Sequence, residues 1–150
     1  FHLYLGLRPG GQKLAAAVFV LGVFSFMIGG VWVGSRGYIG SLQHLLDKPG
    51  TQEVWIAVRS SYEFYLENLV QALRVFVLAL SACFFVVVVR GRTVYPRWFA
   101  ACAPIIPLVL IFTSFFVLPS VGRYLLPAAM NEAHMILFGT SLYLATRRKA

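Results

Sequence analysis

A stripe of polar side chains inside an otherwise apolar stretch is the part of this sequence best suited to binding. At about 100° per residue, Glu67, Gln71 and Arg74 lie on one face of a helix, and Glu63 and Ser81 extend the same arc to roughly 80°. An arginine guanidinium binds carboxylates and phosphates through paired hydrogen bonds, and a neighbouring amide can bridge it to Glu67. The stripe therefore predicts a site for an anionic small molecule or a lipid headgroup. An internal ion-pair network that holds helices together would give the same pattern.

A second polar group, Asn131, Glu132 and His134, could add ligand contacts or acid–base chemistry. Glu132 and His134 have the residue types of a catalytic pair, but at helical spacing they point about 200° apart. His134 instead shares a face with Asn131 and Ser141, about 60° and 20° away, and we expect that face to lie inside the fold. Glu132 would lie near a helix N-terminus, where the helix dipole favours an acid. We therefore predict ligand binding by this group and assign no catalytic residue.

Four apolar stretches must position these side chains: residues 14–33, 70–89, 98–118 and 129–145. A helix needs about 20 apolar residues to cross the hydrocarbon core of a bilayer, and each stretch meets or approaches that length. The chain is 59% hydrophobic and only 12% charged, whereas soluble domains carry about 25% charged residues. The sequence thus predicts an all-α, polytopic transmembrane helical bundle with four full spans.

The second span is expected to be the end of a longer helix. Residues 35–50 form the longest irregular segment, Thr51 is a candidate N-cap, and apolar spacing predicts one helix from about residue 52 to 89. Its first half would lie at the membrane interface. Residues 35–68 would then form an external loop followed by an interfacial helix.

Prolines shape the C-terminal half of the chain. Pro104 and Pro107 predict a kink in the third span, because each removes a backbone donor. Residues 119–124 are expected to be a short connection, and Pro127 suits the first turn of the fourth span. At the other end of the chain, residues 1–7 are interpreted as the tail of an earlier span. Residues 1–150 would therefore be one bundle, a fragment that lacks N-terminal spans.

Charged residues predict the orientation in the membrane. One side of the predicted bundle carries eight bases: Arg8, Lys13, Arg90, Arg92, Arg97, Arg147, Arg148 and Lys149. The other side carries four: Arg36, Lys48, Arg59 and Arg123. By the positive-inside rule, residues 8–13, residues 90–97 and the C-terminus are cytoplasmic. This asymmetry accounts for the net charge of +8 without a nucleic-acid partner.

The predicted topology places both polar groups in the outer half of the membrane. If the second and fourth spans are neighbours, the two groups would line one polar pocket beneath the external loop, with His44 as a possible lid. His2, His44 and His134 do not have the spacing of a metal site, and Cys83 and Cys102 fit core packing. We predict no metal and no cofactor, since the sequence also lacks the HExxH, GxSxG and phosphate-loop motifs.

The segment Thr93-Val94-Tyr95-Pro96-Arg97-Trp98-Phe99-Ala100, followed by Pro104, resembles part of an uncharacterised family of bacterial integral-membrane proteins. That family has a Y-P-R-W turn before a proline-bearing helix and an Asn-containing start to its final helix, which Pro119 and Asn131 fit. The resemblance covers about residues 93–145. It implies a larger bundle in the bacterial inner membrane and carries no known activity.

Three functions fit these observations. The first is binding or transport of a small molecule or lipid, with membrane lipids as partners and Arg74 fixing an anionic group. The second is a structural or assembly subunit, in which the polar stripes only join helices. The third is a membrane-embedded enzyme acting on lipid, with Glu132 or Glu67 and His134 as acid–base groups. We favour a non-enzymatic role and rank binding first.

Overall fold

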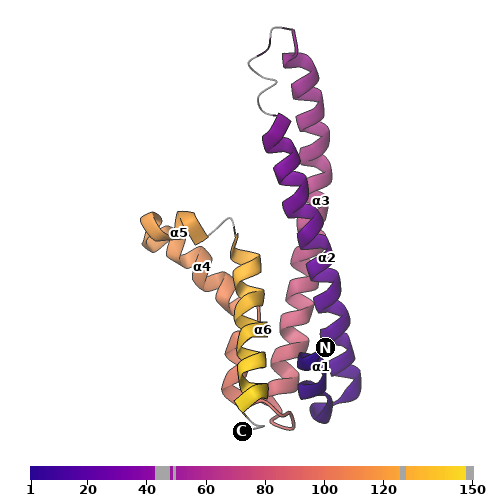
Figure 1. Ribbon diagram of the computed structural model, residues 1–150, viewed down its shortest axis with the longest axis vertical. Coiled ribbons are helices and arrows are strands. Elements are labelled where there is room, and N and C mark those ends of the chain that lie inside the picture. Colours follow the sequence, from indigo (N-terminus) through magenta and orange to yellow (C-terminus); the bar gives the residue numbers. More distant parts are fainter. Residues whose placement is uncertain (43–47, 49, 126–127, 148–150) are drawn as a thin grey trace. The chain divides into compact units, whose positions relative to one another are not determined.

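The computed structural model is all-helical and describes residues 1–42, 48, 50–125 and 128–147, among which no strand occurs. Its elements (Figure 1) are α1 (His2–Leu7), η1 (Arg8–Gly10), α2 (Gln12–Leu42), α3 (Gln52–Val89), η3 (Arg97–Cys102), α4 (Ile105–Val117), α5 (Pro119–Leu125) and α6 (Ala129–Arg147). The chain forms two compact units. Unit 1 comprises Phe1–Val23 and Val77–Ala150, and unit 2 comprises Phe24–Phe76.

Two helices in the described part of the chain are long and apolar enough to cross a membrane: Gln12–Gly37 within α2, and Gln52–Val89. The predicted four full spans are therefore not supported. Helix α4 has 13 residues, which rise about 20 Å, whereas the hydrocarbon core is about 30 Å thick. Helix α6 is longer, with 19 residues, but the polar residues in its first turns lower its hydropathy.

The predicted helix from residue 52 to 89 is confirmed, because α3 runs without a break from Gln52 to Val89. Thr51 stands immediately before it, at the predicted N-cap position, and its hydroxyl donates a hydrogen bond to the Lys48 carbonyl (2.8 Å). After the helix, Gly91 adopts a positive φ of 70°, and its N–H donates to the Val88 carbonyl (2.9 Å). A glycine in this conformation is a common helix stop.

Helix α2 extends further than expected. It continues to Leu42, so the segment predicted as an irregular loop from residue 35 begins as helix. The Ser35 hydroxyl donates to the Trp32 carbonyl (2.8 Å) and accepts a hydrogen bond from the Tyr62 hydroxyl (3.2 Å). The Arg36 guanidinium lies 4.8 Å from the centre of the Trp32 ring. These contacts support the helix through a glycine-rich segment. The proposed lid residue His44 lies outside the described residues.

The predicted third span is interrupted where a kink was expected. Helix η3 ends at Cys102, and Ala103 is extended, with ψ 129°, because the residue before a proline avoids the helical region. Helix α4 begins after Pro104. The connection predicted at residues 119–124 is instead helical and forms α5. Pro127 lies outside the described residues.

Helix α5 folds back closely against α4, within unit 1. Leu118 leaves the helical conformation, and the Gly122 N–H then donates to its carbonyl (2.9 Å). A Cβ on Gly122 would overlap the backbone of Phe115, so this approach requires glycine. Helices α4 and α6 are also in contact.

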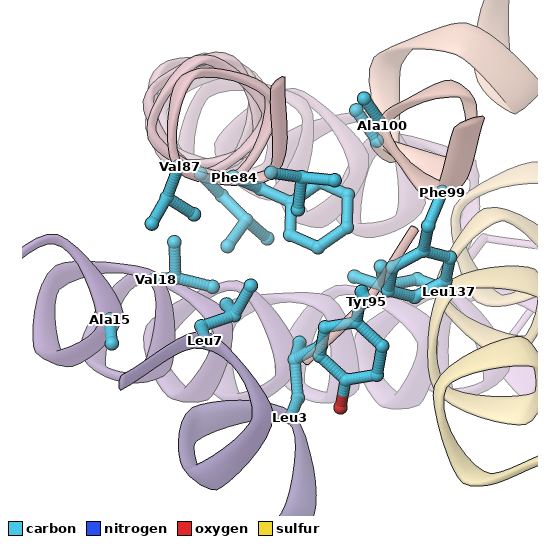
Figure 2. Packing of buried hydrophobic residues seen from close by; sticks show 13 residues of the cluster. Leu3, Leu7, Ala15, Val18, Phe84, Val87, Tyr95, Phe99, Ala100 and Leu137 are labelled. Carbon is cyan, nitrogen blue, oxygen red and sulfur yellow. The ribbon is translucent and has the colours of Figure 1, made fainter. Parts of the chain in front are cut away.

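The hydrophobic core of unit 1 surrounds the turn between α3 and η3 (Figure 2). Phe84 of α3 meets Phe99 of η3 edge-on, with ring centres 5.2 Å apart. The Tyr95 ring lies 4.7 Å from that of Phe99. Side chains of α1, α2 and α6 complete the cluster: Leu3, Leu7, Ala15, Val18 and Leu137. Unit 2 is a simpler pairing, in which Phe24 stacks on Phe76 at 5.5 Å and Trp55 is buried.

Candidate functional site

The polar stripe of α3 contains a hydrogen-bonded pair next to an exposed arginine. The Gln71 amide donates to the Glu67 carboxylate, one helical turn away. Arg74 is exposed, and no described residue forms an ion pair or a hydrogen bond with it. The arrangement gives a guanidinium available to an anionic ligand, beside a carboxylate whose negative charge is already engaged by an amide.

The stripe does not face the interior as predicted. Glu63, Glu67, Gln71 and Arg74 are exposed, whereas Ser81 is buried. Glu63 forms an ion pair with Arg59 at 2.8 Å, between two exposed side chains. The buried side of α3 in unit 2 carries Trp55 and Leu73 instead. The charged face is therefore an outer surface of unit 2.

Ser81 has a role that the sequence did not reveal. Its hydroxyl oxygen accepts a hydrogen bond from the Ile105 N–H (3.0 Å) at the start of α4. The first N–H groups of a helix have no partner within the helix, so a side chain must satisfy them when they are buried. Here the cap comes from α3, not from the residue before α4. Pro104 marks the start of α4 in the sequence. Ser81 lies 24 positions before Ile105, so no local pattern predicts their contact.

The three residues of the second polar group lie in different environments on α6. His134 is buried, Glu132 is half-buried and Asn131 is exposed. The prediction that His134 and Ser141 share an inward face is confirmed, since both are buried. For Asn131 that prediction is wrong. Glu132 lies in the first turn of the helix, as expected.

Contacts within α6 fix the His134 ring. Its Nδ1 donates to the Met130 carbonyl (2.7 Å), and its ring stacks on Phe138 at 6.4 Å. This hydrogen bond sets the tautomer and orientation of the imidazole. The two predicted groups of site residues belong to different compact units, since Glu67, Gln71 and Arg74 are in unit 2 and the α6 residues are in unit 1. A pocket shared between them stays a prediction.

Unit 1 contains a buried pair of hydroxyls that the sequence did not predict. The Tyr95 hydroxyl lies 2.7 Å from Ser141 Oγ and donates weakly to the His2 carbonyl at 3.4 Å. Burial raises the pKa of Tyr95, and the hydrogen bond with Ser141 acts in the opposite direction. The Tyr95 ring lies against Gly6, where a Cβ would overlap it. This pair joins the turn after α3 to α6 and α1.

Within the described ranges, no three His, Cys, Asp or Glu side chains gather as a metal site would require. The two cysteines, Cys83 and Cys102, are free and half-buried. No protein-family model matches the chain, and no curated protein or solved structure matches it. The resemblance of the Tyr95–Trp98 turn to bacterial integral-membrane proteins therefore stays a prediction.

Proposed function

We propose that the chain is an integral membrane protein that α2 and α3 anchor by crossing the bilayer. Only 28% and 39% of their most apolar stretches are buried within the protein, so much of that surface is left for lipid. The helices of a soluble core would be mostly covered. By the positive-inside rule, we infer that residues 8–13, residues 90–97 and the C-terminus are cytoplasmic. The membrane expected from the resemblance is the bacterial inner membrane.

Within that membrane, we infer that the α3 stripe binds an anionic small molecule or a lipid headgroup. The observation that carries this proposal is Arg74, which is exposed and has no acidic partner among the described residues, while Gln71 engages Glu67. An arginine inside the hydrocarbon core is costly unless an anion or water solvates it. Arg74 is the main binding residue in this proposal, and Gln71 orients the bound group.

The depth of Arg74 favours a phosphate as the bound group. Arg90 lies 16 positions after Arg74, and at 1.5 Å per residue the helix rises about 24 Å between them. If Arg90 lies at one boundary of a hydrocarbon core of about 30 Å, Arg74 lies about 6 Å inside the other. An arginine side chain extends over that distance toward the headgroups. Its guanidinium would then reach the boundary between the hydrocarbon core and the headgroups.

A structural or assembly role is the second candidate. The contacts of Ser81 with Ile105 and of Tyr95 with Ser141 use buried hydroxyls only to join helices, as this role requires. A lipid-acting enzyme has less support. His134 Nδ1 is engaged with the Met130 carbonyl, and the nearest candidate acid on its own helix, Glu132, points about 200° away at helical spacing.

Native mass spectrometry of the gently extracted protein tests the binding proposal. We expect a discrete bound mass that contains phosphate or carboxylate, and its loss in Arg74→Gln with at least about tenfold weaker affinity, because a charge-assisted hydrogen bond is removed. Arg74→Lys should retain part of the binding, since lysine keeps the charge but not the paired geometry. Arg36→Gln is the matched control, because Arg36 is an exposed base of unit 2 that lies over Trp32.

The outcomes separate the two candidates. Equal retention of the bound mass in Arg74→Gln and Arg36→Gln would contradict the binding proposal. If neither the wild type nor the variants carry a bound mass and Arg74→Gln only lowers the melting temperature, the structural role is favoured.

A further inference from the structure

Three basic segments lie close together at one end of unit 1: residues 8–13, residues 90–97 and the C-terminal turn of α6. The turn between α3 and η3 contacts α1 through the Val94 N–H, which donates to the Gly6 carbonyl (2.9 Å). The same turn contacts η1, since a Cβ on Gly10 would lie 2.7 Å from Thr93 Cγ2. It also contacts the C-terminal half of α6 through Tyr95 and Ser141. The base-rich ends of these segments therefore lie around one buried tyrosine.

The bases at this end are all exposed: Arg8, Lys13, Arg90, Arg92, Arg97 and Arg147. Among the described residues of unit 1, the one acid is Glu132. It lies in the first turn of α6, and the 15 residues from there to Arg147 rise about 22 Å along the helix. No described acid thus neutralises this end of the unit.

The turn that carries the central bases is packed against the core of unit 1. Gly91 has a positive φ of 70°, and the Arg97 Nε lies 2.7 Å from the position that a Cβ on Gly91 would occupy. The Arg97 side chain therefore lies across the C-terminal end of α3, where backbone carbonyls concentrate negative charge. Tyr95 is 3% exposed and anchors the same turn in the core. The turn that presents the bases is therefore anchored in the core.

Exposed apolar side chains next to the bases indicate which kind of anionic partner the bases would bind. Trp98 directly follows Arg97 and is 58% exposed, and Phe85 and Val89 near the end of α3 are exposed as well. Tryptophan is enriched at the level of lipid headgroups, between water and hydrocarbon. Exposed apolar surface directly beside a row of bases matches a lipid layer, whose phosphates lie above its acyl chains.

We propose that this basic end of unit 1 is a docking surface for acidic phospholipids, with Arg90, Arg92, Arg97 and Lys13 facing their phosphates and Trp98 inserted beside them. The inference rests on the proposed membrane location of the chain, but it concerns a different leaflet and different residues from the Arg74 site. Clusters of bases next to a membrane helix attract anionic headgroups. The surface should therefore favour phosphatidylglycerol over phosphatidylcholine.

Electron paramagnetic resonance of spin-labelled lipids tests this preference directly. The full chain is reconstituted in phosphatidylcholine bilayers, and the association of labelled phosphatidylglycerol is compared with that of labelled phosphatidylcholine. We expect the wild type to prefer phosphatidylglycerol. In the double variant Lys13→Gln/Arg92→Gln the preference should fall by up to about fivefold per base removed. The matched control is Arg36→Gln/Arg123→Gln, which removes two exposed bases that each lie over an aromatic ring.

Each outcome decides the proposal. The docking proposal would be overturned if the two lipids associate equally with the wild type, or if the control variant loses the preference equally. Neither result would contradict the Arg74 site. A chain that cannot be reconstituted into bilayers would overturn both proposals. A preference lost only in Lys13→Gln/Arg92→Gln, with an unchanged melting temperature, supports it.

Discussion

Removing the Tyr95 hydroxyl should cost the protein a measurable part of its stability. Tyr95→Phe leaves the ring against Gly6 and Phe99 but removes the 2.7 Å hydrogen bond with Ser141. Ser141 is fully buried, so its hydroxyl would lose this partner without gaining water. A buried polar group left unsatisfied costs about 1–3 kcal/mol. We expect the free energy of unfolding of Tyr95→Phe to fall by about 2 kcal/mol, near the middle of that range.

The appropriate assay is a reversible denaturant titration in detergent micelles, followed by circular dichroism. Tyr143→Phe is the matched control, because Tyr143 lies on α6 and is 51% exposed. Its free energy of unfolding should stay within about 0.5 kcal/mol of the wild type. Combining Tyr95→Phe with Ser141→Ala removes both members of the pair. The double variant should lose about 1 kcal/mol less than the sum of the single losses.

Two results would contradict this prediction. If Tyr95→Phe unfolds with the same free energy as Tyr143→Phe, the buried hydroxyl contributes nothing. If the losses of the two single variants add fully, the two hydroxyls act independently and do not form the coupled pair that joins the turn to α6.

Three further predictions concern the same unit. Gly6→Ala should destabilise the fold by about 1–3 kcal/mol, because its Cβ would overlap the Tyr95 ring, whereas Gly139→Ala, which has open space around it, should be neutral or stabilising in thermal unfolding. Ser81→Ala should cost about 0.5–2 kcal/mol and speed hydrogen exchange at the Ile105 amide, and unchanged exchange there would argue against the cap from α3. Burial raises the pKa of Tyr95 above 10.0. The unfolded phenol therefore ionises first, and stability should hold below pH 10 and fall as the pH rises through the raised value, more steeply in the wild type than in Tyr95→Phe.

The sequence predicted helix limits well where strong local signals mark them. Thr51 precedes α3 and Gly91 follows it, and the observed helix agrees with the prediction at both ends. The end of α2 was predicted too early because Gly34 and Gly37 favour a break. The contact of Ser35 with Tyr62 joins residues 27 positions apart, and it supports the helix against that local preference.

The site was predictable only at the level of helical spacing. The bond between Gln71 and Glu67 and the shared burial of His134 and Ser141 follow from residues on one helix. Which face of α3 is exposed depends on its partner helix, and helical spacing does not encode that choice. The pairing of Tyr95 with Ser141 spans 46 positions. Long-range contacts of this kind depend on how α6 packs against the turn, so no local sequence pattern predicts them.

The depth of α3 in a bilayer most directly tests the proposed membrane location and the Arg74 site, because both depend on it. Single spin labels replace exposed residues of α3 in a protein without Cys83 and Cys102, and their contact with oxygen and with a water-soluble nickel complex is compared. The labelled positions are Tyr65, Val75, Leu78, Phe85 and Val89.

We expect Leu78 to be the deepest position, Val75 and Phe85 to be shallower and similar to each other, Val89 to lie near a boundary, and Tyr65 to contact water. This profile would centre the buried segment about 15 Å from Arg90, near residue 80. Equal contact with the nickel complex at all five positions would contradict the membrane location. A profile deepest at Val75 would place Arg74 far from the headgroups and contradict the proposed site.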